Sequence, residues 1–382
     1  IISNLPIVCR KSIKYLCSDF QMKKLIILTL YILLNSIFAF ASPFSFSFDE
    51  ATGEATLLSA EKSLSKAVVI PDSVENGGRY YSVTKIAKQA FAKCGKMETV
   101  KLPSKLKTIG PTAFAECSKL KSIVIPDDVD VIPHHCFFFC ASLESVTLPS
   151  SLNTIEHDAF IACRSLQTIY IPKSVHHIGS WAFGENLALK SVDFESGNNK
   201  LSIGDHAFDR SGLETLVIPS FVDSLGEYVF NGCGSLKSVV VEANLDTLPK
   251  MTFHSCEDMT ELSLNGAMNA IAYGAFSECK KLASITLPTT LKEIGVNAFD
   301  GCKNLTTINL QNLPSLQSIG EAAFSGCEKL ERVILPNGIK KIEDGTFMSC
   351  HSLIEIIGTN VESEAEFSFY DCPKLKTKKF AK

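Results

Sequence analysis

Cysteine and histidine are the residues of this chain that could do chemistry, because their side chains bind metals, form disulfides or act as nucleophiles. The chain has fourteen cysteines and eight histidines among 382 residues. Most of the cysteines follow a phenylalanine by three residues, and Asn186 takes that position once. The members of this column are Cys94, Cys117, Cys140, Cys163, Cys233, Cys256, Cys279, Cys302, Cys327, Cys350 and Cys372.

This regular cysteine spacing argues against both disulfides and a zinc site. Equivalent side chains on stacked coils lie about 4.8 Å apart, whereas a disulfide needs Cβ atoms about 3.8 Å apart. Zinc needs ligands that converge on one point. We therefore expect a column of buried free thiols that fills space as small apolar groups. Cys136, which replaces the usual alanine before a phenylalanine, should also point inward.

Histidines gather in one part of the repeat. His134 and His157 each lie three residues before a repeat phenylalanine, so they should stack about 5 Å apart. His135 should likewise lie beside Asp158. Two imidazoles and a carboxylate could form a small metal site. The preferred interpretation is an exposed polar turn, and we predict no metal and no cofactor.

No catalytic residue is predicted. The sequence lacks G-x-S-x-G, H-E-x-x-H, a Gly-rich phosphate loop followed by Lys and Ser or Thr, and a dinucleotide-binding fingerprint. These absences favour a protein that is not an enzyme.

The elements that position these side chains come from an internal repeat of 22 to 25 residues. Each coil reads roughly I-G-x-x-A-F-x-x-C-x-x-L-x-x-I-x-L-P. Apolar residues two apart, such as Ile123 and Ile125, predict a strand, and Pro126 ends it. A glycine four residues before the phenylalanine, such as Gly110, predicts a tight bend. The repeated phenylalanines are Phe91, Phe114, Phe137, Phe160, Phe183, Phe208, Phe230, Phe253, Phe276, Phe299, Phe324, Phe347 and Phe369.

This motif resembles the BspA-like leucine-rich repeat family of secreted and surface proteins of Bacteroides-type bacteria. The resemblance covers nearly the whole chain after Ser42 and predicts a leucine-rich-repeat solenoid. We expect it to be rich in β-structure, with a parallel sheet along the rod and about thirteen coils of ~23 residues. Residues 44–66 do not fit the repeat and predict an N-terminal β-hairpin cap. Some family members resemble adhesins that bind host extracellular-matrix proteins, and many have no assigned role.

The start of the chain predicts export. Residues 1–21 are interpreted as a spurious upstream extension and residues 22–41 as a signal peptide that opens MKKLIILTLYILL and ends in A-x-A. Its apolar run of about 14 residues is shorter than the roughly 20 that a spanning helix needs. We therefore expect no stable membrane span after cleavage. Residues 42–79 are assigned to the cap and first strand, and residues 80–382 to the solenoid with a short basic tail.

The charge of the chain excludes one class of partner. From Ser42 onward it has 32 basic and 40 acidic residues, a net charge of −8. Such an acidic chain is not expected to bind nucleic acid.

Four aromatic residues are the predicted binding residues. Phe138 and Phe139 replace the small or polar pair that usually follows the repeat phenylalanine, and Trp181 is the only tryptophan. Tyr170 is the single aromatic residue in the outward column of the predicted strand. Exposed apolar side chains of this size mark contact sites, although local packing is the alternative explanation.

We therefore predict an exported, non-enzymatic protein that binds a protein partner, such as a host matrix protein, at the cell surface. A periplasmic or released form is equally consistent with the sequence. The alternatives are a glycan-binding or metal-dependent accessory protein with its site on coils three to five, and a purely structural envelope protein.

Overall fold

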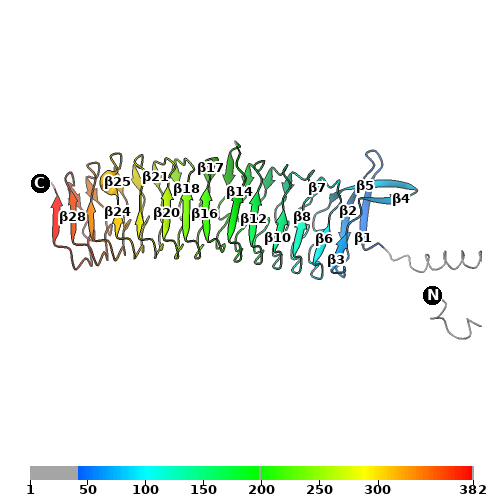
Figure 1. The fold of residues 1–382 in the computed structure, drawn as a ribbon, viewed down its shortest axis with the longest axis horizontal. Coiled ribbons are helices and arrows are strands. Elements are labelled where there is room, and N and C mark those ends of the chain that lie inside the picture. The colour runs from blue at the N-terminus through cyan, green and yellow to red at the C-terminus, as the bar shows by residue number, and fades with distance from the viewer. Residues whose placement is uncertain (1–41, 198, 381–382) are drawn as a thin grey trace, which may run out of the picture. The chain divides into compact units, whose positions relative to one another are not determined.

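The computed structural model describes residues 42–197 and 199–380. The predicted upstream extension and signal peptide lie outside the described residues. Residues from Phe44 onward form one compact unit. This unit is a β-solenoid of about 13 turns, whose coils follow one another along a single axis (Figure 1). The predicted solenoid is therefore confirmed.

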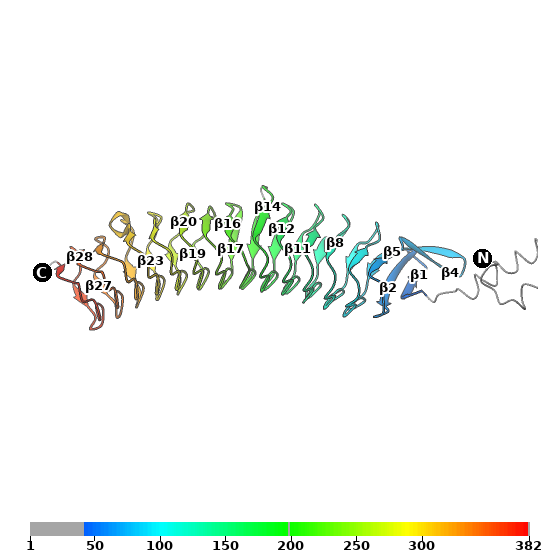
Figure 2. The same ribbon diagram turned by 60° about the horizontal axis from the view of Figure 1, so that its bottom comes forward.

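Two columns of parallel strands run along the stack, with a two-hairpin cap at its N-terminal end (Figure 2). The cap strands are β1 (Phe44–Asp49), β2 (Glu54–Ala60), β4 (Ser73–Asn76) and β5 (Arg79–Ile86). The first column contains β3 (Ala67–Val69), β6 (Thr99–Lys101), β8 (Ser122–Val124), β10 (Ser145–Thr147), β12 (Thr168–Ile171), β14 (Ser191–Phe194), β16 (Thr215–Ile218), β18 (Ser238–Val241), β20 (Glu261–Leu264), β22 (Ser284–Ile285), β24 (Thr307–Ile308), β26 (Arg332–Ile334), β28 (Glu355–Gly358) and β30 (Thr377–Phe380). The second contains β7 (Thr108–Ile109), β9 (Val131–Ile132), β11 (Thr154–Ile155), β13 (His177–Ile178), β15 (Leu201–Ile203), β17 (Val222–Leu225), β19 (Thr247–Leu248), β21 (Ala270–Ile271), β23 (Glu293–Ile294), β25 (Ser318–Ile319), β27 (Lys341–Ile342) and β29 (Ser363–Glu364).

The first column is the strand that the alternating apolar pattern predicts. In β8, Ile123 is buried between the exposed Ser122 and Val124. The second column was not predicted, because most of its strands have only two residues, too few to show an alternating pattern. Both columns pair in parallel register from coil to coil, as in β12 with β14 and β11 with β13.

The N-terminal hairpin is also confirmed. Strands β1 and β2 are antiparallel, and β2 pairs in parallel with β5. Strand β5 in turn pairs in parallel with β7, so the hairpin is continuous with the second column. The ring of Phe44 packs edge-on against Phe91, with 6.0 Å between ring centroids. The cap therefore covers the apolar end that a bare first coil would expose to solvent.

A continuous stack of rings fills the interior. Successive repeat phenylalanines from Phe91 to Phe369 lie 5.0 to 5.7 Å apart between centroids, with interplanar angles of 1 to 13°. All of these rings except Phe369 are fully buried. Each buried ring contributes about 3 to 5 kcal/mol compared with alanine. The repeat of this residue therefore places one buried ring in the core of each coil.

The cysteine column lies beside this stack, as predicted. Ten of the column thiols donate to the backbone carbonyl of the phenylalanine in the preceding coil, at 3.0 to 3.4 Å from sulfur to oxygen. All column thiols are buried except Cys372, which is half-buried, and Cys136 is buried too. Ser211 and Asn186 occupy the position in the two coils that lack cysteine, and both are buried. The thiols therefore have a polar role as well as filling space.

The glycines before the phenylalanine allow close packing between coils at the start of a bend. A Cβ atom on Gly110 would lie 2.4 Å from the backbone nitrogen of Lys88, and one on Gly179 would lie 2.5 Å from that of His157. Neither glycine has a positive φ. The expected tight bend does begin here, because the Gly110 carbonyl accepts a hydrogen bond from the Ala113 amide three residues later, at 3.2 Å. The left-handed residues of this bend lie closer to the phenylalanine.

Helical structure is nearly absent from the part of the chain that the structure describes. The one helix there is a short 3-10 helix, η2 (Leu310–Asn312). Within residues 42–197 and 199–380, no helix is long and apolar enough to cross a membrane.

Candidate interaction surface

Two left-handed residues flank most of the repeat phenylalanines. The residues two before and two after it have a positive φ, as in Trp181 (58°) and Glu185 (57°) around Phe183. This conformation costs a residue other than glycine about 1 to 2 kcal/mol. Hydrogen bonds between coils offset the cost, such as the one from the Trp181 amide to the Asp205 carbonyl at 2.9 Å. Side chains at these two positions therefore stand in columns on a solvent-facing turn.

Trp181 begins an aromatic ladder in the first of these turn columns. Its indole stacks on His206 at 4.3 Å and 6°, and His206 stacks on Tyr228 at 4.7 Å and 8°. The His206 Nδ1 lies 2.6 Å from a carboxylate oxygen of the buried Asp209, which fixes the middle ring. Gly184 leaves room for the indole, because a Cβ there would lie 2.7 Å from Trp181 Cε3. The ladder rings are therefore held in place by their neighbours in the folded chain.

A lysine and a second tyrosine extend this ladder. Lys250 Nζ lies 5.4 Å from the ring centroid of Tyr228 and 6.0 Å from that of Tyr273, within the range of cation–π attraction. Tyr228, Lys250 and Tyr273 were not predicted from the sequence. Tyr228 lies two residues before Phe230, the same offset that Trp181 has from Phe183, and this shared offset is the signal that could have found it.

Phe138 and Phe139 lie on the turn of the third coil. Their rings contact each other at 4.4 Å between centroids. Phe139 is 42% exposed, whereas Phe138 is half-buried and packs against the His135 ring at 5.2 Å. The expectation of exposed apolar side chains therefore holds for Phe139 and only partly for Phe138.

Tyr170 lies in a different part of the coil. It is on the outward face of β12, is 54% exposed, and is paired in register with Asp193 of β14. Desolvation, followed by the charge of Glu195 and a hydrogen bond to it, raises the pKa of the Tyr170 hydroxyl. Of the four predicted residues, only Phe138 and Phe139 are in contact with each other among the described contacts. The structure places Trp181 in the ladder and Tyr170 on the sheet face.

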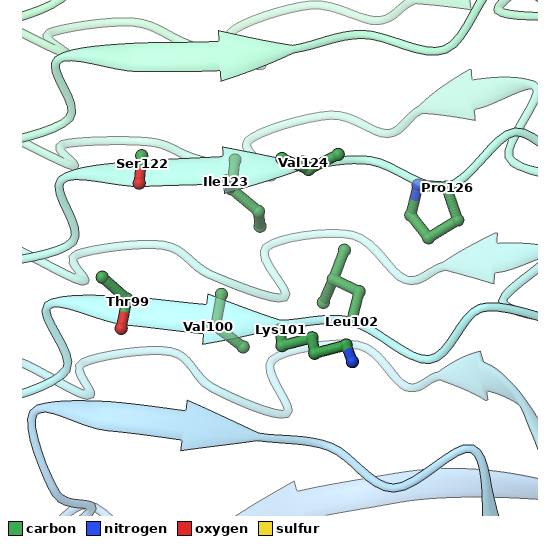
Figure 3. Close-up of a pocket in the computed structure, with 8 residues that line it drawn as sticks. All are labelled: Thr99, Val100, Lys101, Leu102, Ser122, Ile123, Val124 and Pro126. Carbon is green, nitrogen blue, oxygen red and sulfur yellow. The ribbon is translucent and has the colours of Figure 1, made fainter.

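The outward face of the first strand column forms shallow hollows. Figure 3 shows one of them, where Thr99–Lys101 of β6 and the following Leu102 lie beside Ser122–Val124 of β8 and Pro126. Val124 is 64% exposed there. The hollow lies between neighbouring coils and is partly open to solvent.

The predicted histidine contacts are present. His134 and His157 stack at 5.0 Å and 3°, and His135 meets His157 edge-on at 5.4 Å. Asp158 Oδ2 lies 3.6 Å from His135 Nε2. Burial lowers the pKa of His135, the Asp158 charge opposes this shift, and His157 and His134 reinforce it. The expected polar turn is therefore a compact cluster of imidazoles and a carboxylate.

Comparisons with known proteins agree with this repeat. A family model described as a BspA type leucine rich repeat region, of six copies, matches residues 84–202, 186–284 and 269–382. No curated protein sequence matches the chain.

Several similar solved structures come from bacterial proteins described as leucine-rich or leucine-rich repeat proteins. A leucine rich cell surface protein from Faecalibacterium prausnitzii is 24% identical with a TM-score of 0.54, over 89% of this chain and 94% of that one. A leucine-rich repeat protein from Bacteroides ovatus is 27% identical with a TM-score of 0.40, over 89% of this chain and 99% of that one. The pneumococcal vaccine antigen PcpA is 20% identical with a TM-score of 0.47, over 87% and 90%.

Proposed function

The chain belongs to the BspA type leucine-rich repeat family, and from this membership we propose that it is an exported, non-catalytic protein that binds a protein partner at the cell surface. We propose a host extracellular-matrix protein as the class of partner. Repeat solenoids bind proteins through extended surfaces to which several coils contribute. In this chain the surface is formed by the turn columns and the outward face of the first strand column.

The observation that carries this proposal is the presence of large aromatic side chains at exposed positions of a rigid scaffold. Phe139 and Tyr170 are 42% and 54% exposed, although most of their columns hold small or polar residues. Trp181 is held by stacking on His206. Rigid aromatic residues lose little conformational entropy on binding and are enriched among residues that dominate interface energies.

Export is supported by the segment that begins at Met22, which has the lysines, apolar run and small-residue end of a signal peptide. The description of the Faecalibacterium prausnitzii protein as a cell surface protein supports the same location. Protease treatment of intact cells tests this part: rapid cleavage before lysis is expected, and protection until lysis would contradict a surface location.

Binding is tested with the purified chain immobilised against collagen, laminin and fibronectin as representative matrix proteins. We expect the double variant Phe139→Ser/Tyr170→Ser to lose about 30-fold or more in affinity, because even one residue that dominates an interface contributes about 2 kcal/mol or more. The melting temperature should hardly change, since both side chains are exposed.

Tyr370→Ser is the matched control, because Tyr370 is 62% exposed on the last coil and far along the chain from the proposed surface. It should bind as the unmodified chain does. Equal affinities for the double variant and the control would overturn the assignment of the surface. Binding to a glycan array but to no matrix protein would replace the proposed protein partner with a glycan.

A further inference from the structure

We propose that His135, His157 and Asp158 bind one divalent transition-metal ion, of which zinc is the best example. This site goes beyond the proposed partner binding and does not depend on it. One ligand atom from each of the three residues lies within 4.8 Å of the other two. The residues come from only two neighbouring coils, so the stacking of the solenoid brings them together.

The site needs only small side-chain movements to close. Zinc bonds of about 2.1 Å in a tetrahedral site place ligand atoms about 3.4 Å apart. His135 Nε2 and Asp158 Oδ2 are already 3.6 Å apart. His157 is the exposed member of the three, so a small shift of its ring along the His134 face can close the remaining distance. The remaining adjustment is therefore at most about 1.4 Å for any ligand pair.

Neighbouring rings restrict both imidazole ligands before metal arrives. The His157 ring lies flat on His134 at 5.0 Å, and the His135 ring packs against Phe138 at 5.2 Å. Fewer orientations are therefore lost when the metal binds, which favours affinity. The carboxylate of Glu156 accepts a hydrogen bond from the His134 backbone amide at 2.8 Å and lies beside the His134 ring. Glu156 therefore holds in place the ring on which His157 stacks.

The ligand set selects the class of metal. Two imidazoles and one carboxylate suit zinc, copper and nickel, whereas calcium and magnesium take oxygen ligands. Three protein ligands leave the fourth tetrahedral position for water or for a side chain of a bound partner. The buried thiols do not compete, because every described cysteine except Cys372 is buried.

The proposal is tested by titrating Zn²⁺ into chelator-treated protein in a calorimeter, followed by Co²⁺ substitution. We expect one equivalent of zinc and a cobalt visible spectrum typical of tetrahedral nitrogen and oxygen ligands. Ligand removal should cost at least as much as the loss of a supporting residue around a metal, which is about 10- to 100-fold. His157→Ala and Asp158→Asn should therefore each weaken binding about tenfold or more.

The matched control is His351→Ala, because His351 is an exposed histidine that lies 3.0 Å from the carboxylate of Asp371 but has no second imidazole beside it among the described residues. This variant should bind zinc as the unmodified protein does. The proposal is overturned if the unmodified protein takes up no zinc, or if His157→Ala and His351→Ala bind equally well. A sulfur-to-cobalt charge-transfer band that disappears in Cys372→Ser would also overturn it, because the metal would then be bound by a thiol.

Discussion

Replacing Asn186 with cysteine should stabilise the solenoid. Asn186 occupies the cysteine position of its coil and is fully buried. Within the described part of the chain, neither its Nδ2 nor its Oδ1 has a hydrogen-bond partner. Cys163, in the coil before, instead donates its thiol to the Phe137 carbonyl at 3.2 Å. A thiol introduced at position 186 would face the equivalent carbonyl of Phe160.

The size of the effect follows from the unsatisfied amide. A buried polar group without a partner costs about 1 to 3 kcal/mol in proteins. Cysteine is slightly smaller than asparagine, so the substitution creates no steric clash and only a small void. We therefore expect Asn186→Cys to raise the free energy of unfolding by about 1 to 3 kcal/mol. In a repeat protein the added stability is local: it strengthens the coil that contains position 186 and its interfaces with the neighbouring coils.

The assay is urea unfolding under reducing conditions, with hydrogen exchange of the amides in neighbouring coils as the local measurement. The unfolding midpoint should rise while the dependence on urea concentration stays the same. Cys163→Asn is the matched reverse control and should destabilise the chain by a similar amount, because it introduces the same buried amide in the preceding coil. The reasoning is refuted if Asn186→Cys is no more stable than the unmodified chain, or if Cys163→Asn has no effect.

Three further predictions concern thiols, pH and the tryptophan. At about pH 8, a thiol reagent should label the half-buried Cys372 before the fully buried Cys94, which should react only after denaturation, because burial raises the Cys94 pKa to about 11; fast labelling of Cys94 in the native chain would contradict this. A hydrogen bond from Lys379 lowers the pKa of Glu355, so this pair stabilises the fold above the usual pKa of 4.5 and loses that contribution as the pH falls below it. The melting temperature should therefore fall on acidification, and less so in Glu355→Gln; equal falls in both proteins would refute the assignment. Gly184→Ala should displace Trp181 from its stack and change the fluorescence of this single tryptophan, since the new Cβ would lie 2.7 Å from the indole; an unchanged spectrum would contradict the clash.

The repeated letters predicted the fold because the same physical requirement recurs in every coil. Phe137 and Cys140 recur because each coil needs a ring and a small group at fixed points of the core. Alternating apolar residues such as Ile123 and Ile125 predict a strand for the same reason. The family could also be assigned on these letters alone. The second strand column escaped prediction, since a two-residue strand such as β7 is defined by its pairing with β5 and not by its own sequence.

The candidate sites were only partly visible in the sequence. Counting from each phenylalanine placed His134 on His157 and His135 beside Asp158, because stacking converts a distance of one repeat into about 5 Å. The sequence could not show that these side chains turn toward a common point, because rotamers depend on neighbours such as Phe138.

What the sequence determined is the period, the buried residues and the column to which each side chain belongs. Tertiary structure alone decided which columns have exposed rings and which rings stack, as with Trp181 on His206. It also decided that Tyr170 lies on a different part of the coil from Phe139. The physical reason is that the sequence gives the order of residues along a coil. The left-handed turns and the contacts between coils set the directions of their side chains.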